Sequence, residues 1–238
     1  MHAGLQQTNW IPRQFQDTAK NLAKEAVERF VRPNRVLGLG SGPMAAAIVR
    51  EMGNFDRKET LECIPTSFQI KLKALCSGLK LVDEDKLPEI DVVFDGADEV
   101  DANFNMIKGG GGALLREKIV HSAAKRIVIA AESSKFVTTF SWPVPIEITP
   151  FAVHSISKRL EDIGSKPVMR MLKEDYPYVT ENGNFILDTF FHFPLDIRGQ
   201  EIKLKNIPGI VEVGLFTKLA NVYYKANEDG AFETIENS

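Results

Sequence analysis

Short apolar runs alternate with helical patterns over the first 140 residues of this chain. Runs of aliphatic residues with the length of buried strands lie at 35–40, 61–64, 79–82, 90–94 and 126–131. Before and between them, apolar residues recur at helical spacing, at about 14–31, 43–52, 68–75 and 113–124. A parallel pair of strands needs a crossover connection, usually a helix. The alternation therefore predicts an α/β fold, a Rossmann-like domain with a mostly parallel sheet.

The pattern changes near Trp142, where Pro143 and Pro145 interrupt the alternation. The following segment combines a strand at 146–148, a helix at 152–163 and strand candidates at 168–172 and 185–189, with a hairpin signal at Asn182-Gly183. Strand candidates at 211–216 and 222–226 lead back to the first unit. We therefore predict a large domain of residues 1–144 and 206–238. A smaller α+β domain of residues 145–205 is inserted before the C-terminal strands.

Composition and charge exclude several classes of protein. The chain carries 29 Lys and Arg against 32 Asp and Glu, a net charge of −3, so we expect no nucleic acid partner. No stretch approaches the roughly 18 apolar residues of a membrane span, and the first residues lack the pattern of a signal peptide. We expect a cytoplasmic protein with no membrane partner. Cys63 and Cys76 form no metal motif and are expected to be reduced and buried, and the four histidines show no ligand spacing, so we predict no metal.

Candidate chemistry is concentrated directly after the apolar run at 90–94. Five carboxylates, Lys108 and four consecutive glycines lie between residues 95 and 117. Asp95 and Asp98 should emerge at the carboxyl end of the strand, which is the edge where open α/β sheets bind ligands. The glycines at 109–112 lead into the start of a predicted helix that carries Glu117 in its first turns.

Glycines before a helix allow backbone N–H groups to approach a substrate oxygen closely, and the helix start adds partial positive charge. Such a nest can hold an oxyanion such as an enediolate, while Glu117 faces the same space as a general base. The simpler alternative is a flexible glycine loop with a helix-capping Glu117 and solvated Asp residues. The glycines alone favour that alternative, whereas their combination with Lys108 and the carboxylates favours a site.

A second glycine-rich turn follows the first apolar run. The predicted strand at 35–40 contains Gly38 and Gly40 and leads through Ser41 and Gly42 into a predicted helix, the arrangement of α/β phosphate sites. A dinucleotide site would also need an acidic residue at the end of a second strand about 20 residues further on, and the sequence shows none. We therefore interpret this turn as a site for a phosphomonoester.

Taken together, these segments resemble the signature of type A ribose-5-phosphate isomerases. The resemblance rests on residues 95–101 (DGADEVD) and 108–119 (KGGGGALLREKI), and it continues through residues 63–69, 181–188 and 207–216. It covers nearly the whole chain beyond the first dozen or so residues. The resemblance implies an enzyme that interconverts D-ribose 5-phosphate and D-ribulose 5-phosphate through a cis-enediolate, in the non-oxidative pentose phosphate pathway. It implies no cofactor.

The resemblance also assigns roles to residues. Glu117 would move the proton between the two carbons. Asp95, Asp98 and Lys108 would open the sugar ring and bind the hydroxyl and carbonyl oxygens of the substrate. The resemblance does not decide which of these three residues opens the ring. The implied substrate-binding residues are Lys20, Ser41, Gly42, Pro43, Met44, Gly96, Ala97, Gly109, Gly110, Gly111 and Lys135. Lys20 is either a phosphate contact or a solvated helix lysine. The small domain would close one side of the site and contribute to a homodimer or homotetramer.

One departure from the family pattern lies in the first glycine turn. Relatives usually carry Gly-[Thr/Ser]-Gly-Ser-Thr, whereas this chain has Pro43 and Met44 at the last two positions. Pro43 has no N–H and neither residue has a hydroxyl, so three expected donors are missing. Locally the change is tolerated, because Ser41 can cap the helix and Pro43 suits its first turn.

Two alternatives follow from the same residues. A non-catalytic sugar-phosphate-binding regulatory paralogue is favoured by the departure at Pro43 and Met44, but it has no need of Glu117 together with Lys108. Aminosugar-phosphate deamination or CoA transfer on a related fold fits the glycine turns, but it does not fit the signature at residues 95–101.

Overall fold

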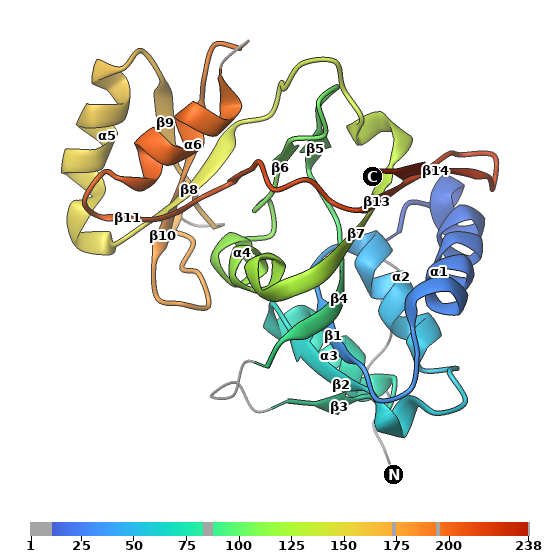
Figure 1. The fold of residues 1–238 in the computed structure, drawn as a ribbon. Helices are drawn as coiled ribbons and strands as arrows, with labels where there is room; N and C mark the ends of the chain where they lie inside the picture. The colour runs from blue at the N-terminus through green and yellow to red at the C-terminus, as the bar shows by residue number, and fades with distance from the viewer. Residues whose placement is uncertain (1–10, 83–87, 173–174, 194–195, 238) are drawn as a thin grey trace.

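The computed structural model describes residues 11–82, 88–172, 175–193 and 196–237 (Figure 1). Its largest sheet has seven strands in the order β14-β13-β7-β4-β1-β2-β3, all parallel except β14. These strands are β1 (Val36–Leu39), β2 (Glu62–Pro65), β3 (Lys80–Leu81), β4 (Ile90–Asp95), β7 (Ala124–Glu132), β13 (Val222–Ala226) and β14 (Phe232–Glu236). The mostly parallel sheet confirms the predicted fold class.

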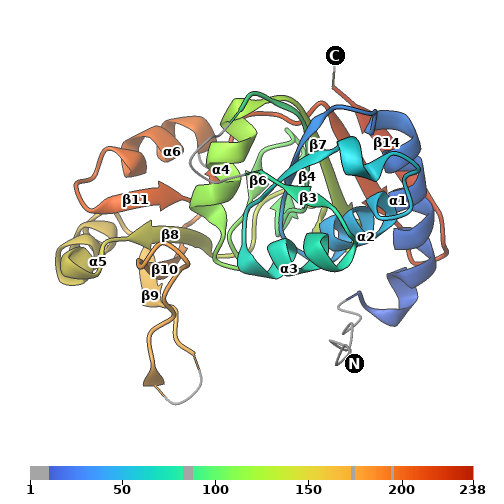
Figure 2. The same cartoon turned by 90° about the horizontal axis from the view of Figure 1, so that it is seen from below.

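Helices cover both faces of this sheet, as Figures 1 and 2 show. Alternate residues of β4 point to opposite faces, because the side-chain period of a strand is two. Val92 and Phe94 pack into the core beneath α1, α2 and α3, whereas Val93 packs into the core on the side of α4. The helices are α1 (Gln16–Phe30), α2 (Pro43–Met52), α3 (Phe68–Cys76) and α4 (Leu114–Ala123). Short 3₁₀ helices span Arg13–Phe15, Lys58–Thr60, Ser133–Lys135 and Pro150–Ala152.

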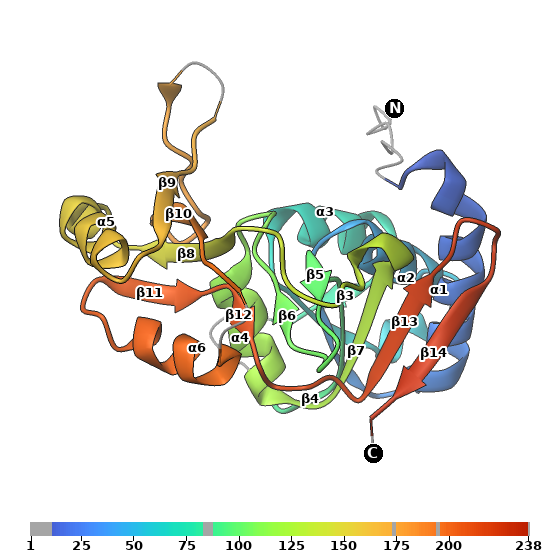
Figure 3. The same cartoon turned by 90° about the horizontal axis from the view of Figure 1, so that it is seen from above.

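Of the two smaller sheets, the four-stranded one lies at the end of the molecule away from α1, and the three-stranded one lies between it and the large sheet (Figures 1 and 3). The four-stranded sheet has the antiparallel order β11-β8-β10-β9 and packs with α5 and α6 around its own apolar core. Its elements are β8 (Val144–Ile148), α5 (Val153–Asp162), β9 (Lys166–Met169), β10 (Phe185–Phe190), α6 (Ile197–Lys205) and β11 (Ile210–Val213). The other is β12-β6-β5, formed by β5 (Glu99–Val100), β6 (Met106–Ile107) and β12 (Leu215–Phe216).

Several elements differ from the sequence prediction. Helix α6 was not predicted, because Gly199 lowers the helical propensity of this segment. Asp196 is the N-cap of the helix, and its side chain accepts a hydrogen bond from the Gly199 N–H. The single strand predicted at 211–216 is two strands in two sheets. Strand β11 pairs with β8 in the four-stranded sheet, and β12 pairs with β6 in the three-stranded sheet. The domain boundaries themselves stay a prediction.

Cysteine burial is a further difference. Cys63 is buried as expected, but Cys76 is exposed, because it is the last residue of α3 and its side chain is on the outer side of that helix. Both are free thiols. Within the described residues, none of the helices is both long and apolar enough to cross a membrane.

Gly214 joins the two small sheets at the point where the chain passes Lys108. Its carbonyl accepts the Lys108 N–H at 2.9 Å, and its own N–H donates to the Pro145 carbonyl at 2.7 Å. A Cβ atom at this position would lie 2.4 Å from the Lys108 carbonyl oxygen. The close approach of three backbone segments therefore requires glycine here.

We expect Gly214→Ala to lower the free energy of unfolding by about 1 to 3 kcal/mol or more, because the methyl group has no room beside the backbone. Urea denaturation measures this difference. Gly111→Ala is the control, since a Cβ there meets open space and should change stability by less than about 1 kcal/mol. Equal stability of the two variants would contradict the packing argument.

Candidate active site

A cavity of about 430 Å³ lies at the carboxyl ends of β1, β4 and β7. Its wall contains most residues that the sequence analysis singled out: Ser41, Gly42, Pro43, Met44, Gly96, Ala97, Asp98, Lys108, Gly109, Gly110, Gly111, Glu117 and Lys135. Asp95 and Lys20 are not part of this wall. The sheet edge thus gathers residues from both glycine turns into one space, as expected for an open α/β sheet.

Lys108 is the centre of a buried group of charges beside the cavity. Its Nζ lies 2.9 Å from Asp95 Oδ2 and 3.1 Å from Glu117 Oε2, and it donates to the Gly96 carbonyl at 2.7 Å. All three charged side chains are at least about nine-tenths buried. The ring of Phe216 lies under the ammonium group, with Nζ 5.5 Å from the ring centroid.

Two carboxylates around one ammonium group change the acidity of Glu117. Burial, followed by the negative charge of Asp95, raises the pKa of Glu117 to about 7, although Lys108 acts in the opposite direction. Burial also disfavours the charged form of Asp95, but Lys108 and His121 outweigh it and lower the pKa of Asp95. Glu117 is therefore a base whose pKa lies near neutral pH, next to a fixed positive charge.

Asp95 is fully buried behind Lys108. Its Oδ1 accepts the N–H of Gly96 at 2.7 Å, and a Cβ on Gly40 would lie only 2.0 Å from its carboxyl group. Glycine at position 40 therefore makes room for this carboxylate. In this arrangement Asp95 reaches the cavity only through Lys108, and direct contact of Asp95 with a substrate stays a prediction.

Asp98 and the glycine loop form another part of the wall. The Gly110 N–H donates to Asp98 Oδ2 at 2.7 Å, and the Gly112 N–H donates to the Gly109 carbonyl at 2.9 Å. Gly109 and Gly112 have φ values of 108° and 81°, in the region that favours glycine. The Gly111 N–H has no protein acceptor within the described residues. The loop therefore has a defined shape and an N–H available for a ligand.

Two residues of the small unit that the sequence analysis did not find hold this loop. Arg170 donates to the carbonyls of Gly109 and Gly110 at 2.9 and 3.1 Å, and the Tyr178 hydroxyl donates to the Gly111 carbonyl at 3.1 Å. A carbonyl and the next N–H point in opposite directions across a trans peptide. By binding the Gly110 carbonyl, Arg170 therefore directs the Gly111 N–H to the other side of that peptide, away from the guanidinium group. No local sequence signal marks either residue.

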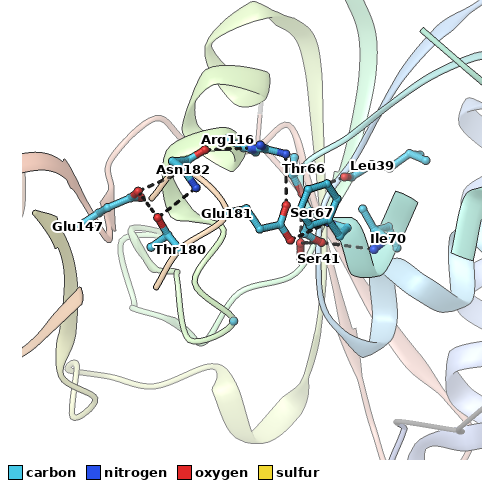
Figure 4. A network of polar contacts seen from close by, with 12 residues as sticks. Leu39, Ser41, Thr66, Ser67, Ile70, Arg116, Glu147, Thr180, Glu181 and Asn182 are labelled. Atoms are coloured by element: carbon cyan, nitrogen blue, oxygen red, sulfur yellow. Dashed lines mark hydrogen bonds and ion pairs between the residues drawn. The ribbon is translucent and has the colours of Figure 1, made fainter. Parts of the chain in front are cut away.

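Glu181 closes the cavity wall from the hairpin that follows Tyr178 (Figure 4). Its carboxylate accepts the N–H of Phe68, the first residue of α3, at 2.7 Å and pairs with Arg116 at 3.2 Å. Arg116 also donates to Asn182 Oδ1 at 3.0 Å, and Asn182 donates to buried Glu147 at 3.1 Å. The expected turn at Asn182-Gly183 is present, and it carries the contacts that join the small sheet to α3 and α4.

The first glycine turn differs from expectation in its capping. Gly42, with φ of 99°, is the N-cap of α2, and Pro43 is the first helical residue as predicted. Ser41 does not cap the helix; its hydroxyl donates to Ser67 Oγ at 2.9 Å, because the neighbouring strand end offers a hydroxyl partner. Ser67 in turn caps α3 by accepting the Ile70 N–H at 3.3 Å.

The remaining predicted binding residues lie in three different environments. Met44 is 2% exposed and packs into the core between α2 and the sheet, although it also borders the cavity. Lys135 lies in the wall and pairs with Glu132 at 2.9 Å. Lys20 is exposed on α1, outside the wall, so its contact with a phosphate stays a prediction.

Comparisons with known proteins show the family of this chain. A family model described as ribose 5-phosphate isomerase A (phosphoriboisomerase A) matches residues 62–230. Ribose-5-phosphate isomerase A of Thermosynechococcus vestitus is 43% identical over 84% of this chain and 87% of its own length. The human ribose-5-phosphate isomerase is 42% identical over 90% of this chain and 72% of its own length. The solved structure of ribose 5-phosphate isomerase A from Methanocaldococcus jannaschii superposes with a TM-score of 0.86 at 36% identity, covering 93% of this chain and 99% of that one.

The chain belongs to the ribose 5-phosphate isomerase A family.

Two carboxylates of the isomerase signature have structural roles. Both oxygens of Glu99 are used by the backbone and hydroxyl of Ser141, at 2.8 and 2.5 Å. Asp101 accepts the N–H groups of Asn103 and Asn105, both at 2.8 Å. The density of acidic residues therefore serves two purposes: Asp95, Asp98 and Glu117 gather at the cavity, while Glu99 and Asp101 fix the loops around it.

We expect the free energy of unfolding of Glu117→Gln to increase relative to that of the wild-type protein as the pH rises. Because the folded-state pKa of Glu117 is above its unfolded value, wild type loses stability as pH rises from about 4.5 to about 7, by up to about 1.4 kcal/mol per unit. The variant lacks this loss. Urea denaturation at pH 5 and pH 8 measures the difference. Glu28→Gln, exposed on α1, is the control, and an equally steep trend there would contradict burial as the cause.

Proposed function

We propose that this chain catalyses the interconversion of D-ribose 5-phosphate and D-ribulose 5-phosphate without a cofactor. The observation that supports it most is Glu117, a cavity-wall carboxylate with a pKa of about 7, 3.1 Å from the Lys108 ammonium group. Relatives of this chain are named ribose-5-phosphate isomerases. One solved structure of a D-ribose-5-phosphate isomerase is in complex with phospho-erythronic acid. It is 34% identical to this chain, with a TM-score of 0.88, and the match covers 94% of this chain and 99% of that one.

The proposed reaction moves one proton between neighbouring carbons of the open-chain sugar. Glu117 removes the proton from C2, the C–H electron pair forms the C1–C2 double bond, and the aldehyde oxygen becomes an enediolate oxygen. The O2 proton then passes to O1, the C2 carbonyl forms, and Glu117 returns its proton to C1. One carboxylate serves both carbons because they are adjacent. Lys108 and the Gly111 N–H stabilise the negative charge that develops on the oxygens.

Ring opening is proposed to depend on Asp98. Of Asp95 and Asp98, only Asp98 borders the cavity. Asp98 is therefore placed to accept the proton of the ring hydroxyl, whereas Asp95 acts by keeping Lys108 in position. Asp98 would then pass this proton to the ring oxygen, which becomes a hydroxyl, while the Lys108 ammonium group donates a hydrogen bond to that oxygen and keeps its charge.

The phosphate is proposed to bind at the start of α2 together with Lys135. The first hydrogen bond of α2 joins the Ala46 N–H to the Gly42 carbonyl at 3.0 Å, so the N–H groups of Met44 and Ala45 are free for an anion. Lys135 and Lys108 are the cations of the described cavity wall, and Lys108 is already held by two carboxylates. These groups partly replace the donors that Pro43 and Met44 lack.

The alternative functions have less support. A non-catalytic regulatory paralogue has no use for a buried carboxylate whose pKa is matched to neutral pH, and the relatives reported above are named as isomerases. Deamination or CoA transfer finds no counterpart among those relatives. The homodimeric or homotetrameric state and the cytoplasmic location stay predictions from the sequence.

The proposed activity is tested by following ribose 5-phosphate by NMR with wild type and Glu117→Gln. We expect wild type to form ribulose 5-phosphate, also after EDTA treatment, and to lose kcat/KM as pH falls below about 7, where Glu117 becomes protonated. Glu117→Gln should keep substrate binding but lower kcat at least about 10²-fold. Glu28→Gln is the control with unchanged kcat. Binding without turnover in wild type would favour the regulatory alternative.

We expect Pro43→Ser to strengthen the binding of the substrate phosphate. It restores one N–H and one hydroxyl at a half-buried position without disturbing the core that Met44 fills. A hydrogen bond to a charged group contributes roughly 1.5 to 3 kcal/mol, so kcat/KM for ribose 5-phosphate should rise about tenfold or more. Pro43→Ala, which restores only the N–H, should give part of this gain. Equal kinetics of all three proteins, or the same gain with unphosphorylated ribose, would place the phosphate elsewhere.

A further inference from the structure

His121 is a buried titratable residue that the proposed reaction does not use. It lies on α4 four residues after Glu117, so the two side chains project from the same face of the helix. The residue is 2% exposed and is not part of the cavity wall. Its Nε2 is 2.8 Å from Asp95 Oδ2, and its ring meets Phe216 edge-on with the centroids 5.4 Å apart. His121 therefore contacts the charged group through Asp95, outside the cavity wall.

The surroundings of His121 favour the neutral ring, with its proton on Nε2. Burial lowers its pKa below the usual value, and the charges of Lys108 and Lys218 add to this effect against the attraction of Asp95. Lys218 also donates to the His121 carbonyl at 2.7 Å. Within the described part of the chain Nδ1 has no hydrogen-bond partner, whereas Nε2 faces a carboxylate that only accepts. The hydrogen bond to Asp95 thus sets the tautomer.

The two oxygens of Asp95 are fully used. Oδ2 is contacted by His121 at 2.8 Å and by Lys108 at 2.9 Å, and Oδ1 accepts the Gly96 N–H at 2.7 Å. These donors come from α4, from the segment after β6 and from the end of β4. Rotation of the carboxylate moves both oxygens and would therefore disturb all three contacts. The orientation of Asp95, and with it the position of Lys108, therefore depends on the donor that His121 supplies.

We propose that His121 is a positioning residue for the isomerisation, whose Nε2–H holds the Asp95 carboxylate so that Lys108 stays between Asp95 and Glu117. The proposal rests on the proposed function. A neutral donor suits this place, because an additional positive charge would lower the pKa of Glu117 and weaken it as a base. An apolar residue would leave Asp95 with one donor fewer and Lys108 less firmly held.

The test compares His121→Leu with His121→Gln in the ribose 5-phosphate assay. Leucine fills a similar volume without a donor, whereas the glutamine Nε2 is the same number of bonds from the backbone and is a neutral donor. We expect His121→Leu to lower kcat about 10- to 100-fold, the effect of one hydrogen bond to a charged group, with KM changed less than about threefold. His121→Gln should recover kcat to within about fivefold of wild type, which a purely structural role would not require.

The outcomes separate the proposal from the proposed function. Absence of wild-type turnover refutes the function and the proposal with it. An active wild type with normal kcat in folded His121→Leu, or with His121→Gln as impaired as His121→Leu, refutes the positioning role alone. Nitrogen-15 NMR of labelled histidine in wild type adds a test that needs no variant: the Nε2–H tautomer should persist from pH 6 to pH 8. A ring that titrates in this range, or carries its proton on Nδ1, overturns the proposal.

Discussion

The position of one buried ammonium group is the constraint on which this site depends. Removing a lysine from water costs several kcal/mol unless other groups compensate, and Lys108 is compensated by Asp95, Glu117 and the Gly96 carbonyl. These partners come from the end of β4, the start of α4 and the loop between β4 and β5. The fold must therefore bring three chain segments together before the lysine is stable. Burial and, after it, the negative charge of Asp95 raise the pKa of Glu117 to about 7, although Lys108 acts in the opposite direction.

The candidate site is formed partly by the parallel sheet and partly by residues of the small unit. The sheet edge supplies the charged residues, but the shape of the glycine loop depends on Arg170 and Tyr178, and the cavity wall is completed by Glu181. Gly214 connects β11 to β12 at a position that has no space for a side chain. A disturbance of the small sheet is thus expected to change the glycine loop without touching Glu117 or Lys108.

Predictions about the fold succeeded where the physical signal is local. Apolar runs and helical spacing located the strands and helices of the parallel sheet, because burial of each face follows the period of the element. Helix α6 was missed, since Gly199 weakens its local propensity, and residues 211–216 were taken for one strand, since their division into β11 and β12 depends on pairing with distant partners.

The sequence by itself determined the α/β class, the family, and the residue types of the candidate site, because the Asp-Gly-Ala-Asp segment and the glycine loop are contiguous motifs with fixed spacing. Only the tertiary structure decided how these residues act on one another. It buried Asp95 behind Lys108, left Lys20 outside the cavity wall, and brought Arg170, Tyr178 and His121 to the site. Burial and charge pairing are properties of neighbours in space, and for these residues the neighbours are distant in sequence.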